Sequence, residues 1–250
     1  MKLSGGFLFL LLVTGALARW LGPRPVYEPL VAEMIPSSRA RELGLDQLLE
    51  KKDPHHAAEL AAANGISLES LPALKGGEEL FDADNDGDLD LFSIPRDPTE
   101  GPSLPFFYLN DGRGRFREVA RLLGAAFTIP RSVRASLSGD FDRDGRVDIA
   151  LFLSDGSWLV FWNRLEERPC IQLRIQPAPE ESFSREEPVR VELEAGPKRQ
   201  VQLVMPGAVA HFGLGEAQRV DKVTVIWPSG HRDELSGLDA GREHEITEKR

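Results

Sequence analysis

The sequence predicts a mainly β protein with a short helical segment near its N-terminus and a small antiparallel β-domain at its C-terminus. Three observations support this class. The 250 residues include 23 glycines and 18 prolines but only 8% aromatics, which is typical of many turns and short strands. Two segments in the middle repeat one order of strands and aspartate-rich turns, and the last third alternates apolar with polar residues.

The N-terminus has the pattern of an export signal. Lys2 gives a short positive region, an apolar run covers 7–17, and Ala16-Leu17-Ala18 supplies a small-x-small cleavage pattern. Arg19 ends the run well short of the roughly 20 apolar residues that a membrane span requires. We therefore expect residues 1–18 to be a signal peptide and the chain to be secreted or extracytoplasmic, with no membrane span after cleavage. An uncleaved anchor is the alternative.

The next segments are predicted as an arm and then helices. Residues 19–38 are rich in proline and read as an extended linker or wrap-around arm, and residues 39–75 form the helical segment. Two short helices with a break near Lys52 are expected, because Asp53-Pro54 fits an N-cap followed by a first-turn proline and Gly65 fits a C-terminal stop.

Residues 76–165 contain the two repeats. Each runs as a strand, an aspartate-rich loop, a strand, a turn and an aromatic strand ending in asparagine. The loops begin at Asp82 and Asp140, spaced 58 positions apart, a period in the range of propeller blades and similar repeats. The second copy is shorter and lacks the turn at 111–114.

Both loops follow the pattern D-x-D-x-D-G-x-x-D, which predicts a calcium site. Calcium takes about 6–8 oxygen ligands, and alternate residues of a tight loop can aim carboxylates at one centre, whereas magnesium demands octahedral geometry. Glycine at position six permits the bend, and position seven is expected to offer its backbone carbonyl. The predicted ligands are Asp82, Asp84, Asp86, Asp88 and Asp90 in the first loop, and Asp140, Asp142, Asp144, Arg146 and Asp148 in the second.

An EF-hand is excluded, because its position-twelve glutamate is replaced by Ser93 and Leu151 and strand-like sequence follows each loop. The plainer alternative is a pair of ordinary Asp/Gly turns. Carboxylates crowded so closely would repel one another strongly without a cation, which favours the metal site.

Residues 166–250 are predicted to be a separate β-domain. Four stretches alternate apolar with polar residues, as half-buried antiparallel strands do. They are residues 171–176, 189–195, 199–205 and 220–227, and Pro228-Ser229-Gly230 marks a turn.

These motifs resemble known families. The two loop segments are similar to the FG-GAP or VCBS-type repeats of integrin-like β-propellers, in which such calcium loops sit in a hairpin. The sequences HFGLG (211–215) and VIWPSG (225–230) resemble the ASPIC/UnbV domain that follows such repeats in cartilage acidic protein-like chains. The usual glycine-alanine start of that domain is replaced here by SREEPVRV (184–191).

The resemblance implies propeller-blade-like repeats, yet a propeller ring needs about four to eight blades and two cannot close one. The exposed sheet edges must therefore be covered in another way. We expect the helices at 39–64 or the C-terminal domain to cover the sheet. Assembly between chains is the alternative.

Two histidines, His55 and His211, are candidate site residues. His55 and Glu59 have a spacing that can bind zinc on a helix, but no third ligand accompanies them, so a solvated helix surface is the better interpretation. His211 precedes a glycine-bounded strand or turn, and it is expected to have a structural role there, with catalysis as the alternative.

Other conspicuous residues are interpreted as structural. Trp158, Phe161 and Trp162 are expected to pack in the repeat core, with a carbohydrate or protein contact surface as the alternative. Cys170, the single cysteine, is expected to be a buried, inert thiol.

The sequence thus predicts a secreted, non-enzymatic calcium-binding protein of the adhesion or scaffold type, whose partner is a protein or carbohydrate. A net charge of -10 argues against a nucleic-acid partner. The rival interpretation is a hydrolase or tailoring enzyme acting on a polysaccharide or natural product. A third alternative is an inert chain whose loops fold without metal.

Overall fold

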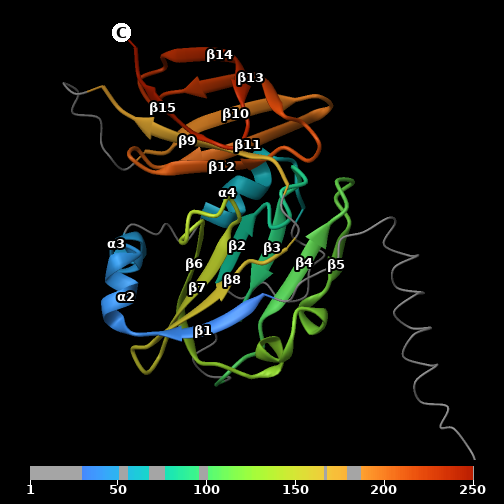
Figure 1. Ribbon diagram of the computed structural model, residues 1–250, viewed down its shortest axis with the longest axis vertical. Helices are drawn as coiled ribbons and strands as arrows, with labels where there is room; N and C mark the ends of the chain where they lie inside the picture. Colours follow the sequence, from blue (N-terminus) through green and yellow to red (C-terminus); the bar gives the residue numbers. More distant parts are fainter. Residues whose placement is uncertain are drawn as a thin grey trace, which may run out of the picture.

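The computed structural model describes residues 30–50, 56–67, 77–95, 101–165, 168–178 and 187–249. The predicted signal peptide at 1–18, the break near Lys52 and the Asp53-Pro54 cap lie outside these residues. The described chain is mainly β, as predicted, and has two parts (Figure 1). Strands β1–β8 and the helices form one part, and strands β9–β15 form the other, stacked on its end.

The first repeat forms a four-stranded antiparallel sheet in sequential order. Its strands are β2 (Glu78–Phe81), β3 (Asp90–Ser93), β4 (Phe106–Asn110) and β5 (Phe116–Glu118). The first acidic loop joins β2 to β3. The 3-10 helices η1 (Ala120–Leu122) and η2 (Ala125–Thr128) then lead to the second repeat.

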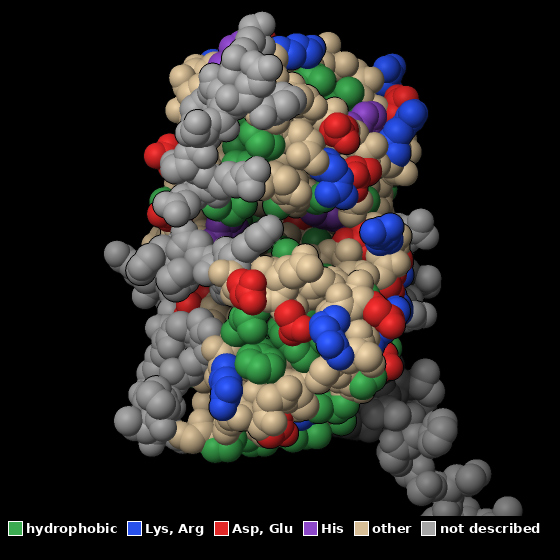
Figure 2. Space-filling model, turned by 90° about the vertical axis from the view of Figure 1, so that its left-hand side faces the viewer, with side chains coloured by type: hydrophobic (Ala, Val, Ile, Leu, Met, Phe, Trp, Pro, Cys, Tyr) green, Lys and Arg blue, Asp and Glu red, His purple; other side chains and the backbone are tan. Residues whose placement is uncertain are grey.

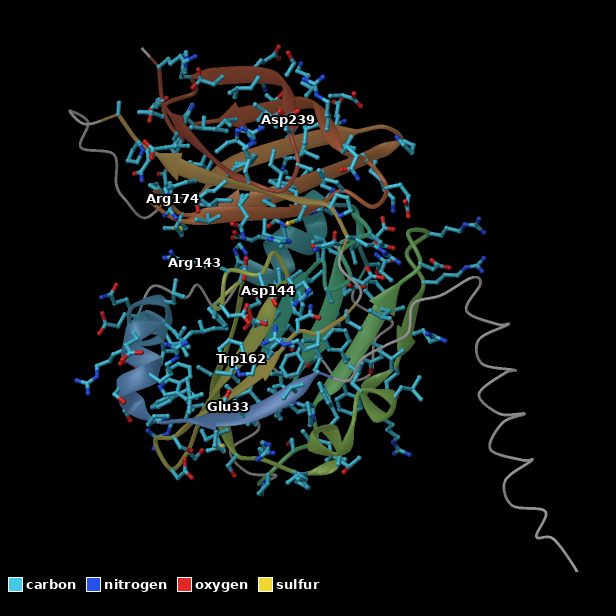
Figure 3. The ribbon with its side chains drawn as sticks, viewed as in Figure 1. Glu33, Arg143, Asp144, Trp162, Arg174 and Asp239 are labelled. Carbon is cyan, nitrogen blue, oxygen red and sulfur yellow. The ribbon has the colours of Figure 1, made fainter. Side chains whose placement is uncertain are left out.

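The second repeat supplies only three strands of its sheet: β6 (Val133–Gly139), β7 (Asp148–Leu153) and β8 (Trp158–Trp162). The fourth is β1 (Val31–Ile35), which pairs antiparallel with β8 in the sheet order β1-β8-β7-β6. Trp162 Nε1 donates to Glu33 Oε2 at 2.7 Å across this pair (Figure 3). Part of the predicted linker at 19–38 is therefore a strand that takes the place of β5.

The two sheets pack face to face around one aromatic core. Phe161 of β8 lies 6.5 Å from Phe92 of β3 and 4.8 Å from Phe127 of η2, measured between ring centroids. The predicted packing of the aromatic strand is confirmed: Phe161 is buried in this core, and Trp158 and Trp162 are buried in a second cluster with Ala40 and Leu45. The two repeats thus share one hydrophobic core between their sheets.

Helices cover the outer faces of both sheets, as expected. Helices α2 (Ser37–Glu42) and α3 (Leu45–Glu50) pack on the second sheet, and α4 (His56–Ala63) packs on the first. The helical segment is more divided than predicted, because Gly44 adopts φ 73 and separates α2 from α3. Gly65, with φ 69, ends α4 as expected: its N–H and that of Ile66 donate to the carbonyls of Ala62 and Ala61.

The C-terminal part is a sandwich of two sheets around its own core. The order of one sheet is β12-β9-β15 and that of the other is β11-β10-β13-β14. The strands are β9 (Cys170–Gln176), β10 (Val189–Ala195), β11 (Lys198–Val204), β12 (Val209–Gly213), β13 (Arg219–Ile226), β14 (Arg232–Asp239) and β15 (Glu243–Thr247).

Four of these strands match the four predicted stretches, but β12, β14 and β15 were not predicted. β14 is largely exposed, so its sequence lacks the apolar alternation that marks a half-buried strand. β15 runs parallel to β9, so the sheet is mixed and not purely antiparallel as predicted. In the part of the chain that the structure describes, no helix has the length and apolar character to cross a bilayer.

We predict that Phe161→Ala lowers the free energy of unfolding by about 3–5 kcal/mol, because it removes a fully buried ring between the two sheets. Thermal and denaturant unfolding should show one transition for both repeats. Leu122→Ala, at a position 51% exposed, serves as the control and should change little. Separate transitions for the two sheets would contradict a shared core.

Candidate metal sites in the acidic loops

The two acidic loops have the same backbone shape. The residue at position four has positive φ in both, 55° at Asn85 and 62° at Arg143, and the position-six glycines have φ 91 and 83. Only glycine takes such angles at position six without strain, which explains Gly87 and Gly145 in the pattern. The repeat predicted from the sequence is therefore also a repeat in three dimensions.

The position-one carboxylate closes each loop. Asp82 Oδ1 accepts a hydrogen bond from the N–H of Asp86 at 3.0 Å, and its Oδ2 accepts one from Gly87 at 2.7 Å. Asp140 accepts from the same two positions of its own loop, both at 3.0 Å. Each first aspartate thus fixes the turn and keeps further lone pairs on its oxygens.

The position-nine carboxylate ties the loop to its sheet. Asp90 accepts from the N–H groups of Ala83 at 2.8 Å and Asn110 at 2.9 Å. In the second loop, Asp148 likewise accepts hydrogen bonds from the N–H groups of Phe141 at 3.0 Å and Asn163 at 2.8 Å.

The asparagine that ends each aromatic strand completes this arrangement. Asn110 Nδ2 donates to the carbonyl of Leu89 at 3.1 Å, and Asn163 Nδ2 donates to that of Val147 at 3.0 Å. The sequence pattern includes both asparagines, but it gave no reason for them. The structure shows that they position the loop.

Carboxylate oxygens converge in both loops. In the first, one oxygen each from Asp82, Asp84 and Asp86 lies within 4.8 Å of the others, and in the second the same holds for Asp140, Asp142 and Asp148. Such oxygen-only clusters suit a hard cation such as calcium. Two other predicted ligands, Asp90 and Asp144, belong to their loops but lie outside these close clusters. The predicted carbonyl ligands at Asp88 and Arg146 stay a prediction.

Burial and mutual repulsion raise the pKa of these carboxyls. The pKa values of Asp82 and Asp90 lie well above the ordinary value, first because of burial and then because neighbouring aspartates repel their charge. Burial also raises the pKa of Asp86 to about 6 and that of Asp148 to about 7. Ionising these loops near neutral pH therefore costs free energy in the absence of a cation.

Basic side chains already neutralise part of the first loop. Arg168 contacts Asp84 at 3.0 Å, and Lys198 pairs with Asp88. The sequence did not predict these partners, because Arg168 is 84 positions from Asp84 and Lys198 is 110 positions from Asp88. No local pattern reveals contacts over such separations.

Arginine neutralises the second loop more fully. Arg164 contacts Asp142 at 2.9 Å and Asp144 at 2.6 Å, and Arg146 also pairs with Asp144. The sequence predicted a role only for the backbone carbonyl of Arg146. The ion pair between its guanidinium and Asp144 was not predicted.

The loops lie where the two parts of the molecule meet. Figure 3 places Asp144 and Arg143 beside the boundary, below Arg174 of β9, and Figure 2 shows histidine and acidic side chains along the groove between the parts. His211 lies on strand β12, one of the two alternatives expected for this segment, and its Nε2 is 2.8 Å from Asn85 Oδ1.

Two further predictions concern Cys170 and the pair His55 and Glu59. Cys170 is buried and forms no disulfide, as expected. Glu59 is exposed on α4, and His55 lies outside the described residues. The zinc pair is therefore not tested.

Comparison with known proteins gives two family matches. Residues 82–151 match the model of the FG-GAP-like repeat, and this match includes both acidic loops. Residues 189–250 match the ASPIC and UnbV model, which covers β10–β15. No curated protein matches the chain. Both resemblances noted in the sequence are thereby confirmed, each over its own segment of the chain.

Proposed function

We propose that this protein is an exported, non-enzymatic calcium-binding protein of the adhesion or scaffold type, in which calcium holds the two acidic loops rigid. The observation that carries the proposal is the convergence of three carboxylates in each of the two loops. Export rests on the predicted signal at residues 1–18. The partner that fits this proposal is a protein or carbohydrate.

The charge in the first loop supports a divalent ion. Five aspartates lie between positions 82 and 90, and the described contacts supply two cations, Arg168 and Lys198. The remaining charge is crowded and partly buried, which the raised pKa values reflect. A doubly charged ion among these oxygens offsets that repulsion.

The bonding of the loop carboxylates supports a structural role for the ions. Asp82, Asp90, Asp140 and Asp148 each accept two backbone N–H groups, so each fixes the main chain as well as facing its loop. Carboxylates that hold the backbone and a cation are poorly suited to act as general bases. The proposal therefore places no catalytic residue in the loops.

Calorimetric titration of the full chain with calcium should show two binding events in the range of about 10⁻⁴ to 10⁻³ M, typical of extracellular sites. Asp84→Ala and Asp142→Ala should each remove one event, and millimolar calcium should raise the melting temperature. Asp46→Ala, an exposed position on α3, is the matched control. Absence of both heat and thermal shift would refute the calcium proposal.

Arg164→Gln should tighten calcium binding at the second loop by a factor of several, because it removes a cation that contacts two of the loop carboxylates. Arg134→Gln deletes the same charge from β6 beside the ring of Phe152 and should leave the affinity nearly unchanged. The same titration measures both variants. Weaker binding in Arg164→Gln would mean that the arginine supports the site.

Without calcium, the free energy of unfolding should fall as pH rises from about 4, the ordinary aspartate value, to about 7. The folded state holds protons on Asp86 and Asp148 more tightly than the unfolded chain does, so their stabilisation is lost as pH passes their raised pKa values of about 6 and about 7. Melting in chelator at several pH values measures this slope. Asp86→Asn should reduce it, whereas Asp46→Asn should not, and saturating calcium should abolish it.

A further inference from the structure

The first acidic loop is also a docking surface for the C-terminal domain. The β12 strand and the turn after it lie directly on the loop backbone: the N–H of Gly215 donates to the carbonyl of Asn85 at 2.8 Å. Lys198 of β11 reaches Asp88 of the same loop. The loop that would hold calcium therefore also carries the neighbouring domain.

Glycine at 213 is required by this contact. A Cβ atom built on Gly213 would lie 2.1 Å from Asp82 Oδ2 and 2.4 Å from the Cα of Asn85. Both distances are far below van der Waals contact, and one of the two atoms is backbone. The middle glycine of the HFGLG motif thus lets the strand approach the first carboxylate of the loop.

Asn85 is the centre of the junction. Its side chain is buried, with Nδ2 donating to the carbonyl of Gly145 in the second loop at 2.8 Å and Oδ1 lying 2.8 Å from His211 Nε2. Because Nδ2 is committed to Gly145, Oδ1 must face the histidine, whose Nε2–H then donates to it. One asparagine joins both acidic loops and the C-terminal domain.

The equivalent position in the second loop lacks this role. Arg143 has nearly the same backbone angle, φ 62 against 55, but its side chain is exposed. The second loop meets the C-terminal domain through other contacts, such as Gln172 Nε2 donating to Asp140 Oδ2 at 2.7 Å. The asparagine at position four is therefore a feature of the first loop alone.

We propose that calcium in the first acidic loop and docking of the C-terminal domain are thermodynamically linked, and that Asn85 and His211 transmit the link. This inference rests on the proposed calcium function. Neutralising the loop holds the Asn85 backbone in the shape that His211 and Gly215 contact, and by reciprocity the docked domain favours the calcium-binding shape. The calcium-loaded chain would then present its two parts as one rigid surface to a partner.

Amide hydrogen exchange of the full chain, with calcium or with chelator, tests the link. The amide of Gly215 reports docking because its acceptor is across the interface, whereas that of Gly230 bonds within its own turn to Trp227 and serves as reference. Calcium should slow exchange at Gly215 by about fivefold or more and leave Gly230 unchanged, since coupling of this kind is typically at least that large. Binding heat without slower exchange at Gly215 overturns the link and leaves the calcium function standing. Absence of binding heat overturns both.

Asn85→Gly keeps the positive φ and deletes the side chain, with Arg143→Gly as the control at the equivalent position. Asn85→Gly should abolish the slowing at Gly215 and weaken calcium at the first loop about fivefold or more, while Arg143→Gly should keep the slowing. His211→Ala is a second variant with the same expected loss. His244→Ala is its control, because His244 Nε2 lies 3.1 Å from the Asp239 carbonyl within its own domain. Full calcium-dependent slowing in both Asn85→Gly and His211→Ala would overturn the proposal.

Discussion

Burial of several carboxylates in two short loops is the constraint on which the rest of this structure depends. A buried negative charge is costly unless hydrogen bonds or a cation offset it. In the first loop, backbone N–H groups donate to the carboxylates at positions one and nine, and basic side chains from distant segments pair with two of the others. Each of these partners fixes part of the fold, so the acidic loops organise the structure around them.

The second repeat shows how a two-repeat module satisfies its sheet edges without a ring. Its own sequence ends after β8, and β1 from the N-terminal arm supplies the missing strand. The face between the sheets is filled by aromatic rings, and helices cover the outer faces. A propeller leaves few strand edges unpaired because its ring closes. Here the edge of β8 is paired by β1 of the same chain.

The C-terminal domain, which is similar to ASPIC and UnbV, makes specific contacts with the repeats. Its β12 strand packs on the first acidic loop, Gln172 of β9 reaches the second, and Asn64 at the end of α4 exchanges two 2.9 Å hydrogen bonds with the backbone of Val201. These contacts explain the HFGLG motif physically, because its glycines allow two backbones to approach closely. The two motifs recognised separately in the sequence lie at one junction.

The sequence by itself determined what depends on neighbouring residues: the mainly β class, the paired D-x-D-x-D-G-x-x-D loops, the four alternating strands of the C-terminal domain and the stop at Gly65. Backbone angles and apolar alternation over a few residues encode these features. Only the tertiary structure decided which segments meet: β1 beside β8, β15 parallel to β9, Arg168 and Lys198 on the first loop, and His211 on Asn85. Such contacts join residues far apart in the chain, and they form because buried charge and open strand edges need partners that no local pattern specifies.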